Sequence, residues 1–491
     1  MKIQHSLFLF LLQWLGTNFI YSQNNVGVGT NSPHISAKLE VESTNQGLLP
    51  PRMSEQQRNT IDSPVAGLMI WCNDCGFSGQ IQVFNGTSWV NMLGENAESI
   101  FHFNQQLGSD IDGEAAQDQS GVSISLSNDG TIIAIGAAFN DGNGTDSGHV
   151  RVYSWNGTTW VQMGADINGE AAGDRSGQSV ALSNDGSRVA IGAGLNDGNG
   201  SNSGHVRVYS WNGTAWMQMG ADINGEAASD QSGISLALSF DGTRVAIGAT
   251  NNDGNGSNSG HVRVYSWNGT TWVQMGGDIN GEVANDYSGN SVSISSDGTR
   301  VAIGASSKDG NGTDSGHVRV YSWNGTAWIQ IGSDINGDAS GDQCGISVSL
   351  SANGNIVAVG ASTNVGNGLR SGQVRVFEWN NSDWVQMGSS MVGSAFLETF
   401  GRSVSISNDG TRLVVGAPLY DGYGADSGKI SVFSWNGFEW AKAGLEFGGE
   451  SAADNSGTSV SISGDGTRIA AGATGNAGNN IGTVGHVRVY E

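Results

Sequence analysis

The chain has 491 residues, 77 of them glycine, and 13% are charged, against about 25% in an average soluble domain. This composition disfavours one ordinary globular core, and 37% hydrophobic residues with regularly spaced glycine disfavour general disorder. The formal net charge of −24 repels phosphate backbones and argues against nucleic acid as a partner.

The N-terminus has the order of a secretory signal peptide. Lys2 precedes an almost wholly apolar stretch from Leu7 to Leu15, and Ser22 offers a small residue for cleavage. The apolar stretch is shorter than the roughly 20 residues that a membrane-spanning helix needs. We predict a signal peptide over residues 1–22 and a secreted or cell-surface protein with no transmembrane segment in the mature chain. The alternatives are an uncleaved anchor or a buried N-terminal helix.

Residues 23–100 are predicted to form an extended lead followed by a small β module. Strands are expected over 67–71 and 80–89, and a short helix over 55–60. Cys72 and Cys75 form a C-x-x-C pair without a thioredoxin-like context, so a local disulfide is the favoured interpretation. The third cysteine, Cys344, stands alone in the region that follows.

An internal repeat of 56 residues organises residues 101–491. Its period appears in a tryptophan series: Trp155, Trp211, Trp267, Trp323, Trp379 and Trp435. A Ser-Asn-Asp-Gly-like motif and a Gly-His-Val-Arg-Val-like motif each occur seven times, so there are seven copies. The last copy is one residue longer, which we place between Asn476 and Val484.

Each copy is predicted to be a four-stranded antiparallel meander. In the second copy, residues 179–183, 188–192, 205–209 and 216–219 alternate or form short apolar runs. The Asn184-Asp-Gly segment between the first two runs is a strong hairpin signal, because its residues tolerate positive φ.

Seven such units are expected to close into one ring, since a single four-stranded sheet cannot bury both of its faces. Residues 105–108 match residues 161–164, and the chain stops at the third strand of a copy, residues 486–491. Pairing these two ends completes one mixed blade and leaves no open edge. The predicted fold is therefore all-β, a seven-bladed β-propeller of 56-residue repeats closed by N- and C-terminal strands and preceded by a small β-rich N-terminal module.

Two parts of the chain resemble known families. Phe400-Gly-Arg-Ser, Leu413-Val-Val-Gly-Ala-Pro and Gly428-Lys-Ile-Ser resemble the FG-GAP repeat of integrin α-chain propellers, and weaker copies cover residues 103–491. This resemblance implies a seven-bladed ring used for extracellular recognition, often with calcium in blade loops. Residues 25–33, 37–41 and 47–53 resemble N-terminal segments of exported surface and fibre-like proteins of Bacteroidetes, which implies a surface setting.

A repeated acidic loop is a candidate calcium site. Oxygen-bearing side chains stand at positions 1, 3, 5 and 9 of the loop, and calcium takes 6 to 8 oxygen ligands. The alternative is that these residues only cap local backbone amides in turns. The loop also differs in place from the integrin-type calcium loop. The candidate ligands are Asp110, Asp112, Glu114 and Asp118; Asp166, Asn168, Glu170 and Asp174; Asp222, Asn224, Glu226 and Asp230; Asp278, Asn280, Glu282 and Asp286; and Asp334, Asn336, Asp338 and Asp342.

Three repeated side chains are expected to be structural. Five histidines open the third strand of their copies, each predicted to make one hydrogen bond rather than to bind metal: His149, His205, His261, His317 and His486. Arg151 shares a strand face with Tyr153, which favours stacking of the guanidinium on the ring. Trp155 and Trp160 are expected to cover a hairpin end between blades, with a sugar clamp as the alternative.

The repeat pattern breaks in copies five and six, where Ser390 and Val392 replace an acidic and an amide residue. An apolar, aromatic-edged patch at this place is a candidate binding surface, and drift of one repeat is the alternative. The candidate ligand-binding residues are Arg370, Phe396, Tyr420 and Tyr423. No nucleophile with a base, and no carboxylate pair at a fixed separation, predicts catalysis.

The sequence favours a non-enzymatic, exported propeller that recognises a protein or a glycan at the cell surface, with calcium as its candidate ion. A polysaccharide hydrolase or lyase, and a structural surface or fibre component assembled by the N-terminal module, are the alternatives.

Overall fold

The computed structural model describes residues 26–28, 39–41, 49–73, 80–91, 105–444, 446–478 and 482–491. The predicted signal peptide, residues 1–22, and Cys75 lie outside these residues. The chain divides into two units, residues 1–99 and 100–491. No helix among the described residues has the length and apolar character needed to cross a bilayer.

The N-terminal unit contains the small β module that the sequence predicts. Strands β1 (Val26–Val28) and β2 (Leu39–Val41) pair in parallel, and a second sheet has the order β3-β4-β5-β6. The other elements are β3 (Arg52–Met53), α2 (Glu55–Asn59), β4 (Met69–Cys72), β5 (Gln80–Phe84) and β6 (Trp89–Asn91). The helix begins with a capping box between Ser54 and Gln57. Cys72 is buried and disulfide-bonded.

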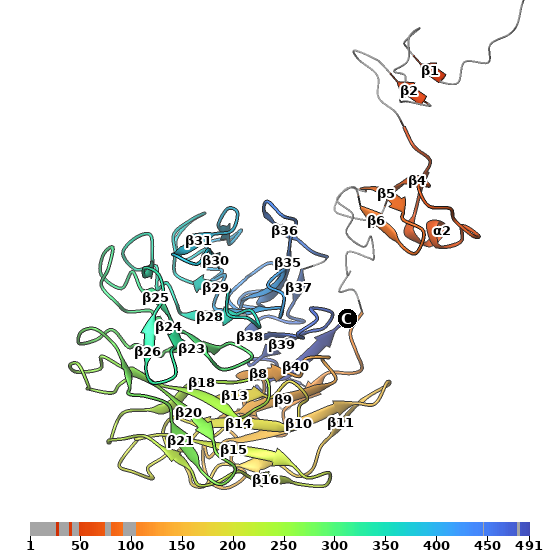
Figure 1. The fold of residues 1–491 in the computed structure, drawn as a ribbon. Helices are drawn as coiled ribbons and strands as arrows, with labels where there is room; N and C mark the ends of the chain where they lie inside the picture. Colours follow the sequence, from red (N-terminus) through yellow and green to blue (C-terminus); the bar gives the residue numbers. More distant parts are fainter. Residues whose placement is uncertain are drawn as a thin grey trace, which may run out of the picture. The chain divides into compact units, whose positions relative to one another are not determined.

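Residues 100–491 form seven sheets arranged as the blades of a β-propeller (Figure 1). The first two blades are β8 (Ser123–Leu126), β9 (Ile132–Ala137), β10 (His149–Trp155), β11 (Trp160–Gln162) and β12 (Ile167–Asn168); and β13 (Ser179–Leu182), β14 (Arg188–Ala193), β15 (His205–Trp211), β16 (Trp216–Gln218) and β17 (Ile223–Asn224). The next two are β18 (Ser232–Leu238), β19 (Arg244–Ala249), β20 (His261–Trp267), β21 (Trp272–Gln274) and β22 (Ile279–Asn280); and β23 (Ser291–Ile294), β24 (Arg300–Ala305), β25 (His317–Trp323), β26 (Trp328–Gln330) and β27 (Ile335–Asn336).

The fifth and sixth blades are β28 (Ser347–Leu350), β29 (Ile356–Ala361), β30 (Gln373–Trp379), β31 (Trp384–Gln386) and β32 (Met391–Val392); and β33 (Ser403–Ile406), β34 (Arg412–Ala417), β35 (Lys429–Trp435), β36 (Trp440–Lys442) and β37 (Phe447–Gly448). The seventh combines β38 (Ser456–Ile462), β39 (Ile469–Ala473) and β40 (His486–Tyr490) with β7 (Ile111–Asp112). These bounds confirm the predicted strands, except that the outer strand of most blades is split in two.

The split outer strand follows from its pairing with the third strand. In the second blade, β16 pairs with the end of β15 and β17 pairs with its beginning, in the registers Trp211↔Trp216 and Val206↔Ile223. The second strand, β14, is buried at five of its six residues, because apolar residues lie on both of its faces. Each blade therefore offers apolar side chains to both neighbouring blades, which is why single units cannot stand alone.

The two ends of the repeat region meet in the seventh blade and close the ring. Ile111 of β7 pairs with Val487 of β40. Leu107 N–H donates to the Val489 carbonyl at 2.8 Å, and Glu491 N–H donates to the Gln105 carbonyl at 2.9 Å. This arrangement confirms the predicted closure.

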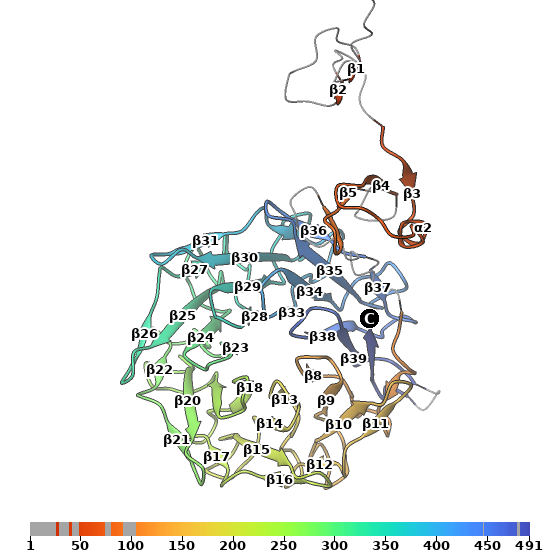
Figure 2. The same cartoon turned by 45° about the vertical axis from the view of Figure 1, so that its right-hand side comes forward.

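A circle of seven backbone hydrogen bonds surrounds the propeller axis. In each blade the N–H of the second residue after the first strand donates to the equivalent carbonyl of the next blade, at 2.8 to 3.0 Å. The circle returns to its start, and its members are Asn128, Asn184, Phe240, Ser296, Ala352, Asn408 and Gly464. Figure 2 shows the innermost strands, such as β8, β13 and β18, facing this centre.

A close backbone approach joins neighbouring blades away from this circle. A Cβ on Gly192 of β14 would lie 2.1 Å from the carbonyl oxygen of Gly233 in the next blade. The same carbonyl accepts a hydrogen bond from Ser179 Oγ at 2.8 Å, and the equivalent serine bond recurs in all seven blades at 2.6 to 2.9 Å. Glycine at this position is therefore required by the spacing of the blades.

Candidate functional site

The last member of each predicted calcium loop serves the local turn. Asp174 is buried, and its Oδ2 accepts hydrogen bonds from Ala171 N–H at 2.9 Å and from Asn196 Nδ2 at 3.1 Å. Asp118 and Asp230 make the same bonds. Asp286 and Asp342 likewise accept from backbone amides three residues before them. These contacts are those of the turn-capping alternative.

The other loop members point to different partners. Asp166 Oδ1 accepts from Gln162 Nε2 at 2.7 Å, and the Asn168 carbonyl accepts from Arg207 Nη2 at 2.8 Å. Among the described residues, no three carboxylates of one loop come within 4.8 Å of one another. One loop alone therefore does not fit calcium, which needs 6 to 8 oxygens around one point. Calcium binding stays a prediction.

The structure instead groups acidic residues of successive loops around the histidines. His205 is 1% exposed, and its Nδ1 lies 3.8 Å from Glu170 Oε2 and 3.9 Å from Asp222 Oδ2. Glu170 belongs to the connection that enters the blade, whereas Asp222 precedes the outer strand β17 of the same blade. The equivalent groups are Glu114, His149 and Asp166; Glu226, His261 and Asp278; Glu282, His317 and Asp334; and Glu450, His486 and Asp110.

Three of these histidines have buried ring nitrogens without a hydrogen-bond partner. Nδ1 of His205 and both ring nitrogens of His261 and His486 are buried without a hydrogen-bond partner. Burial lowers the pKa of His205 to about 4, Arg207 acts in the same direction, and Asp222 and Asp174 oppose it. The prediction of one hydrogen bond is therefore wrong for His261 and His486, because neither ring nitrogen of these residues has a partner.

The arginine and tryptophan predictions are confirmed. Arg207 Cζ lies 5.7 Å from the centroid of the Tyr209 ring, and Arg207 Nη1 lies 3.6 Å from Glu170. The rings of Trp211 and Trp216 are 5.3 Å apart, and Trp216 Nε1 donates to the Met163 carbonyl of the preceding blade at 2.9 Å. The tryptophan pair therefore packs between blades.

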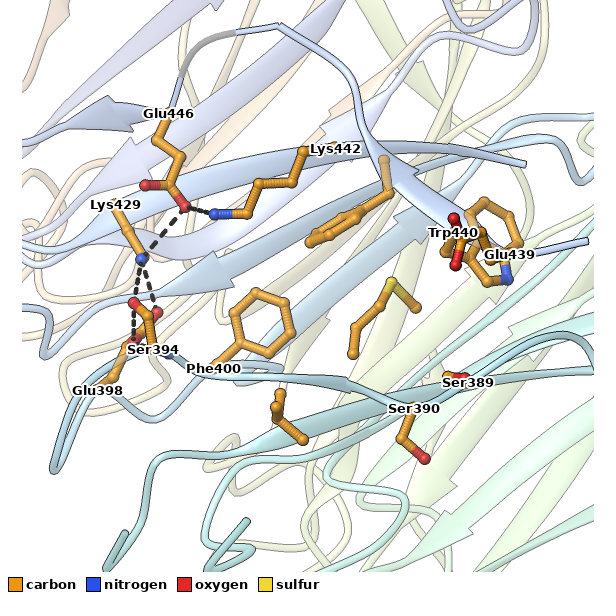
Figure 3. Close-up of a pocket in the computed structure, with 13 residues that line it drawn as sticks. Ser389, Ser390, Ser394, Glu398, Phe400, Lys429, Glu439, Trp440, Lys442 and Glu446 are labelled. Atoms are coloured by element: carbon orange, nitrogen blue, oxygen red, sulfur yellow. Dashed lines mark hydrogen bonds and ion pairs between the residues drawn. The ribbon is translucent and has the colours of Figure 1, made fainter. Parts of the chain in front are cut away.

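A pocket lies where the repeat pattern breaks, between the fifth and sixth blades (Figure 3). We call it the five–six pocket; its volume is about 200 Å³. Its apolar lining includes Met391, Phe400 and Phe433. Ser389 and Ser390 lie at one end with Trp440, and an ionic group lies at the other.

The ionic group of the five–six pocket is centred on a buried lysine. Lys429 is 1% exposed, and its Nζ lies 2.8 Å from Oε1 of Glu398, which is 0% exposed, and 3.3 Å from Glu446. Its ammonium also lies 3.9 Å from the centroid of the Tyr420 ring. Burial raises the pKa of Glu446, but its hydrogen bond with Lys442 and the charge of Lys429 bring that pKa below its usual value.

The indole of Trp440 differs from its counterparts. In five other blades the equivalent indole N–H donates to a carbonyl of the preceding blade at 2.8 to 3.0 Å. Trp440 Nε1 is buried and accepts no such arrangement. Trp440 therefore has an indole N–H without a partner within the protein, and its side chain lines the five–six pocket.

The four predicted ligand-binding residues surround this region without lining the pocket. Phe396 and Tyr423 are exposed by 60% and 51%, and Arg370 is also exposed. Tyr420 is partly buried against the core and contacts Lys429. Lys429 and Trp440 were not among the residues predicted from the sequence. The signal for Lys429 was its replacement of the repeated histidine.

The axial cavities have a different character. One is lined by residues such as Leu126, Asn128 and Phe240, and the other by residues such as Val122, Ser123 and Gln178. Among the described residues, neither lining includes a carboxylate or a histidine. The ionisable groups of the propeller thus gather between blades rather than on the axis.

Comparisons with known protein families give matches in the N-terminal region and in the propeller. Residues 27–107 match the family described as phage tail like trimerisation region, and residues 168–209, 280–321 and 394–433 match the FG-GAP repeat. The propeller therefore carries FG-GAP repeats, as residues 400–433 predict. A solved structure, the hydrazine synthase of Kuenenia stuttgartiensis, is similar with 11% identity and a TM-score of 0.48, covering 75% of this chain and 94% of that one. No curated protein matches the chain.

Proposed function

We propose that this chain, whose propeller carries FG-GAP repeats, is an exported recognition or adhesion protein that binds a protein or a glycan at the cell surface. The propeller fold with FG-GAP repeats suggests a protein-interaction or adhesion-type role. The observation that carries the proposal is the five–six pocket. It occurs where the repeat is broken, and it combines aromatic side chains with the unused indole donor of Trp440.

The pocket's size and lining favour a small polar group with an apolar face. Its volume of about 200 Å³ is below the roughly 300–1,000 Å³ of pockets for drug-sized ligands. A single sugar residue of a glycan, or one side chain of a protein partner, is of this kind. Phe400 and Trp440 would contact the apolar face, and Ser389 and Ser390 would bind hydroxyl or carbonyl groups.

Binding is tested by restoring the repeat at the pocket. Ser390→Asp with Ser394→Glu introduces the side chains that stand at these positions in the first four copies. We expect ligands found on a glycan array and a polysaccharide panel to bind this variant at least about tenfold more weakly, a loss of about 1.4 kcal/mol. Phe438→Ser, at an exposed aromatic outside the pocket, serves as the control.

The outcomes separate this proposal from its rival. Equal binding by the restored variant and the parent would place the ligand elsewhere. Release of shortened products from the polysaccharide panel would instead favour a hydrolase or lyase. The axial linings without carboxylates and the ion-paired state of Glu398 and Glu446 support binding over catalysis.

The N-terminal region supports assembly into trimers. Residues 27–107 match a trimerisation region, so we expect the mature chain to have three times its monomer mass in light-scattering measurements. Three propellers on one stem would bind a repeated surface ligand more tightly than one propeller, because the later contacts become intramolecular. If the mature chain is a monomer in this measurement, the structural or fibre role and the tighter binding of a trimer are both excluded. Ligand binding in the five–six pocket would not be affected by this result.

A further inference from the structure

The histidine clusters have the geometry of cation sites. In the second blade, the side chains of Glu170, His205 and Asp222 point to one place. The histidine Nδ1 at this place has no hydrogen-bond partner in the protein. Nδ1 of His205 faces Glu170 Oε2 at 3.8 Å and Asp222 Oδ2 at 3.9 Å. A nitrogen–oxygen hydrogen bond requires about 2.7 to 3.2 Å, so neither contact is one. Two ligands held about 2.1 Å from a tetrahedral ion are separated by about 3.4 Å, which is close to the observed distances.

The state of the imidazole agrees with a ligand role. His205 is 1% exposed, its Nδ1 has no partner, and a buried unpaired polar group costs about 1 to 3 kcal/mol. Arg207 Nη1 lies 3.6 Å from the other carboxylate oxygen of Glu170, Oε1, where it can orient that carboxylate.

The seven copies provide an internal comparison. The five copies that have the histidine also have both carboxylates, and the two copies that lack the histidine lack one of them. In copy five, Gln373 stands with Asp338 and Ser390. In copy six, Lys429 stands with Ser394 and Glu446, and its ammonium lies 3.3 Å from that glutamate. In the sixth copy, the positively charged Lys429 thus stands where five other copies have a histidine beside carboxylates.

We propose that the clusters of His149, His205, His261 and His486 each bind one divalent transition-metal ion of the zinc class, held by histidine Nδ1, one glutamate and one aspartate. A nitrogen ligand with two carboxylates suits zinc or cobalt, whereas calcium takes oxygen ligands alone. Water completes the coordination on the open side, where the carboxylates are partly exposed.

The His317 cluster is arranged differently. There Arg319 Nε lies 2.9 Å from Asp334, and its guanidinium also contacts Glu282, so an arginine already joins the two carboxylates. This cluster is not expected to bind the ion. The chain therefore offers about four sites of one kind and a fifth in which the guanidinium replaces the metal.

The site at His486 connects the two ends of the ring. Asp110 precedes β7 at the beginning of the propeller, whereas Glu450 and His486 belong to its last two blades. Nδ1 of His486 lies 3.3 Å from Asp110 Oδ2. An ion here would hold the first strand of the propeller against the last one, in addition to the hydrogen bonds of the closure.

The experiment counts ions on the tag-free mature chain after chelation and dialysis. We expect isothermal titration with Zn²⁺ to give about four ions per chain at micromolar or tighter affinity, and Co²⁺ to give the visible absorption of a tetrahedral site. Glu170→Gln with Asp222→Asn removes both carboxylates of one cluster without changing their size. Because both carboxylates are partly exposed, this variant should fold, and the ion count should fall by one.

The control is Asp338→Asn, which makes the same chemical change in the copy that lacks the histidine and should leave the count unchanged. An unchanged count in the double variant, or less than one Zn²⁺ per parent chain, would overturn the proposal. Displacement of Co²⁺ by an equal concentration of Ca²⁺ would also overturn it, because the sites would then be calcium sites. A Tm that rises with Zn²⁺ in the parent, and by less in the double variant, agrees with binding to the folded state.

Discussion

A chain that lacks residues 105–108 is expected to lose the single cooperative unfolding transition of the propeller. Leu107 is buried between the first and last blades, and its N–H donates to the Val489 carbonyl at 2.8 Å. Its own carbonyl accepts from Trp160 Nε1 at 2.9 Å, so the deletion removes contacts with both neighbouring blades. The seventh blade then loses part of its outer strand, and the ring opens at one edge.

The expected loss is large because the closure is shared by the whole ring. The circle of backbone hydrogen bonds returns from Gly464 to Asn128, so separating the first and last blades breaks a contact in the innermost layer as well. We expect scanning calorimetry to show a Tm lower by on the order of 10 °C and a broadened transition. Hydrogen exchange should be fastest in β40, next to the opened edge.

The control for the deletion is a chain that begins at residue 101. It lacks the N-terminal unit, which forms its own compact unit, but keeps the closing segment. Its propeller should unfold at the temperature of the parent. If the chain without residues 105–108 also unfolds like the parent, with protected amides in β40, the ring does not depend on this closure for its stability.

The repeat arithmetic and the local signals made most of the fold predictable. A fixed period of 56 residues gave the number of blades, and Asn-Gly and Asp-Gly turns between alternating runs marked the hairpins. The closure was predictable too, because residues 105–108 and 486–491 are complementary parts of one copy. The sequence did not predict the split of the outer strand, since β16 and β17 both pair with β15 although four residues separate them.

The candidate sites were only partly predictable, because spacing along one loop says little about contacts across loops. Glu170 and Asp166 are close in sequence, but the structure places Glu170 beside Asp222, which lies one full repeat after Asp166. Adjacent blades bring equivalent loops together, so the cluster includes members of two copies and a histidine from the strand between them. The break in copies five and six marked the region of the pocket. The predicted ligand-binding residues there are mostly exposed, whereas the buried Lys429 and Trp440 line the pocket itself.

The second large effect is expected from Lys429→Met. Removing the ammonium leaves the carboxylate of Glu398 fully buried without its counter-ion, and breaking such a buried pair costs about 3 to 5 kcal/mol. The cost arises from the carboxylate that remains rather than from the lysine that is lost. Urea unfolding of the mature chain should therefore show a much lower midpoint with an unchanged slope.

A second substitution separates this explanation from a simple loss of packing. In Lys429→Met with Glu398→Gln, the amide oxygen of Gln can still accept the N–H groups of Ser394 and Ala395, as the carboxylate does at 2.6 and 2.8 Å. No charge is then buried, so we expect the double variant to regain most of the lost free energy of unfolding. A double variant as unstable as Lys429→Met would assign the effect to the cavity or to the contact with Tyr420.

Lys442→Met is the matched control, because both lysines contact the same carboxylate, Glu446, and differ mainly in burial. The side chain of Lys442 is 50% exposed, whereas that of Lys429 is 2% exposed. Exposed ion pairs contribute about 0 to 1 kcal/mol, so Lys442→Met should change the free energy of unfolding by no more than that. In the described structure Lys429 contacts both carboxylates, whereas Lys442 contacts Glu446 alone of the two. Equal effects of the two substitutions would therefore mean that the ion pair with Glu446, rather than the one with the buried Glu398, determines the loss of stability.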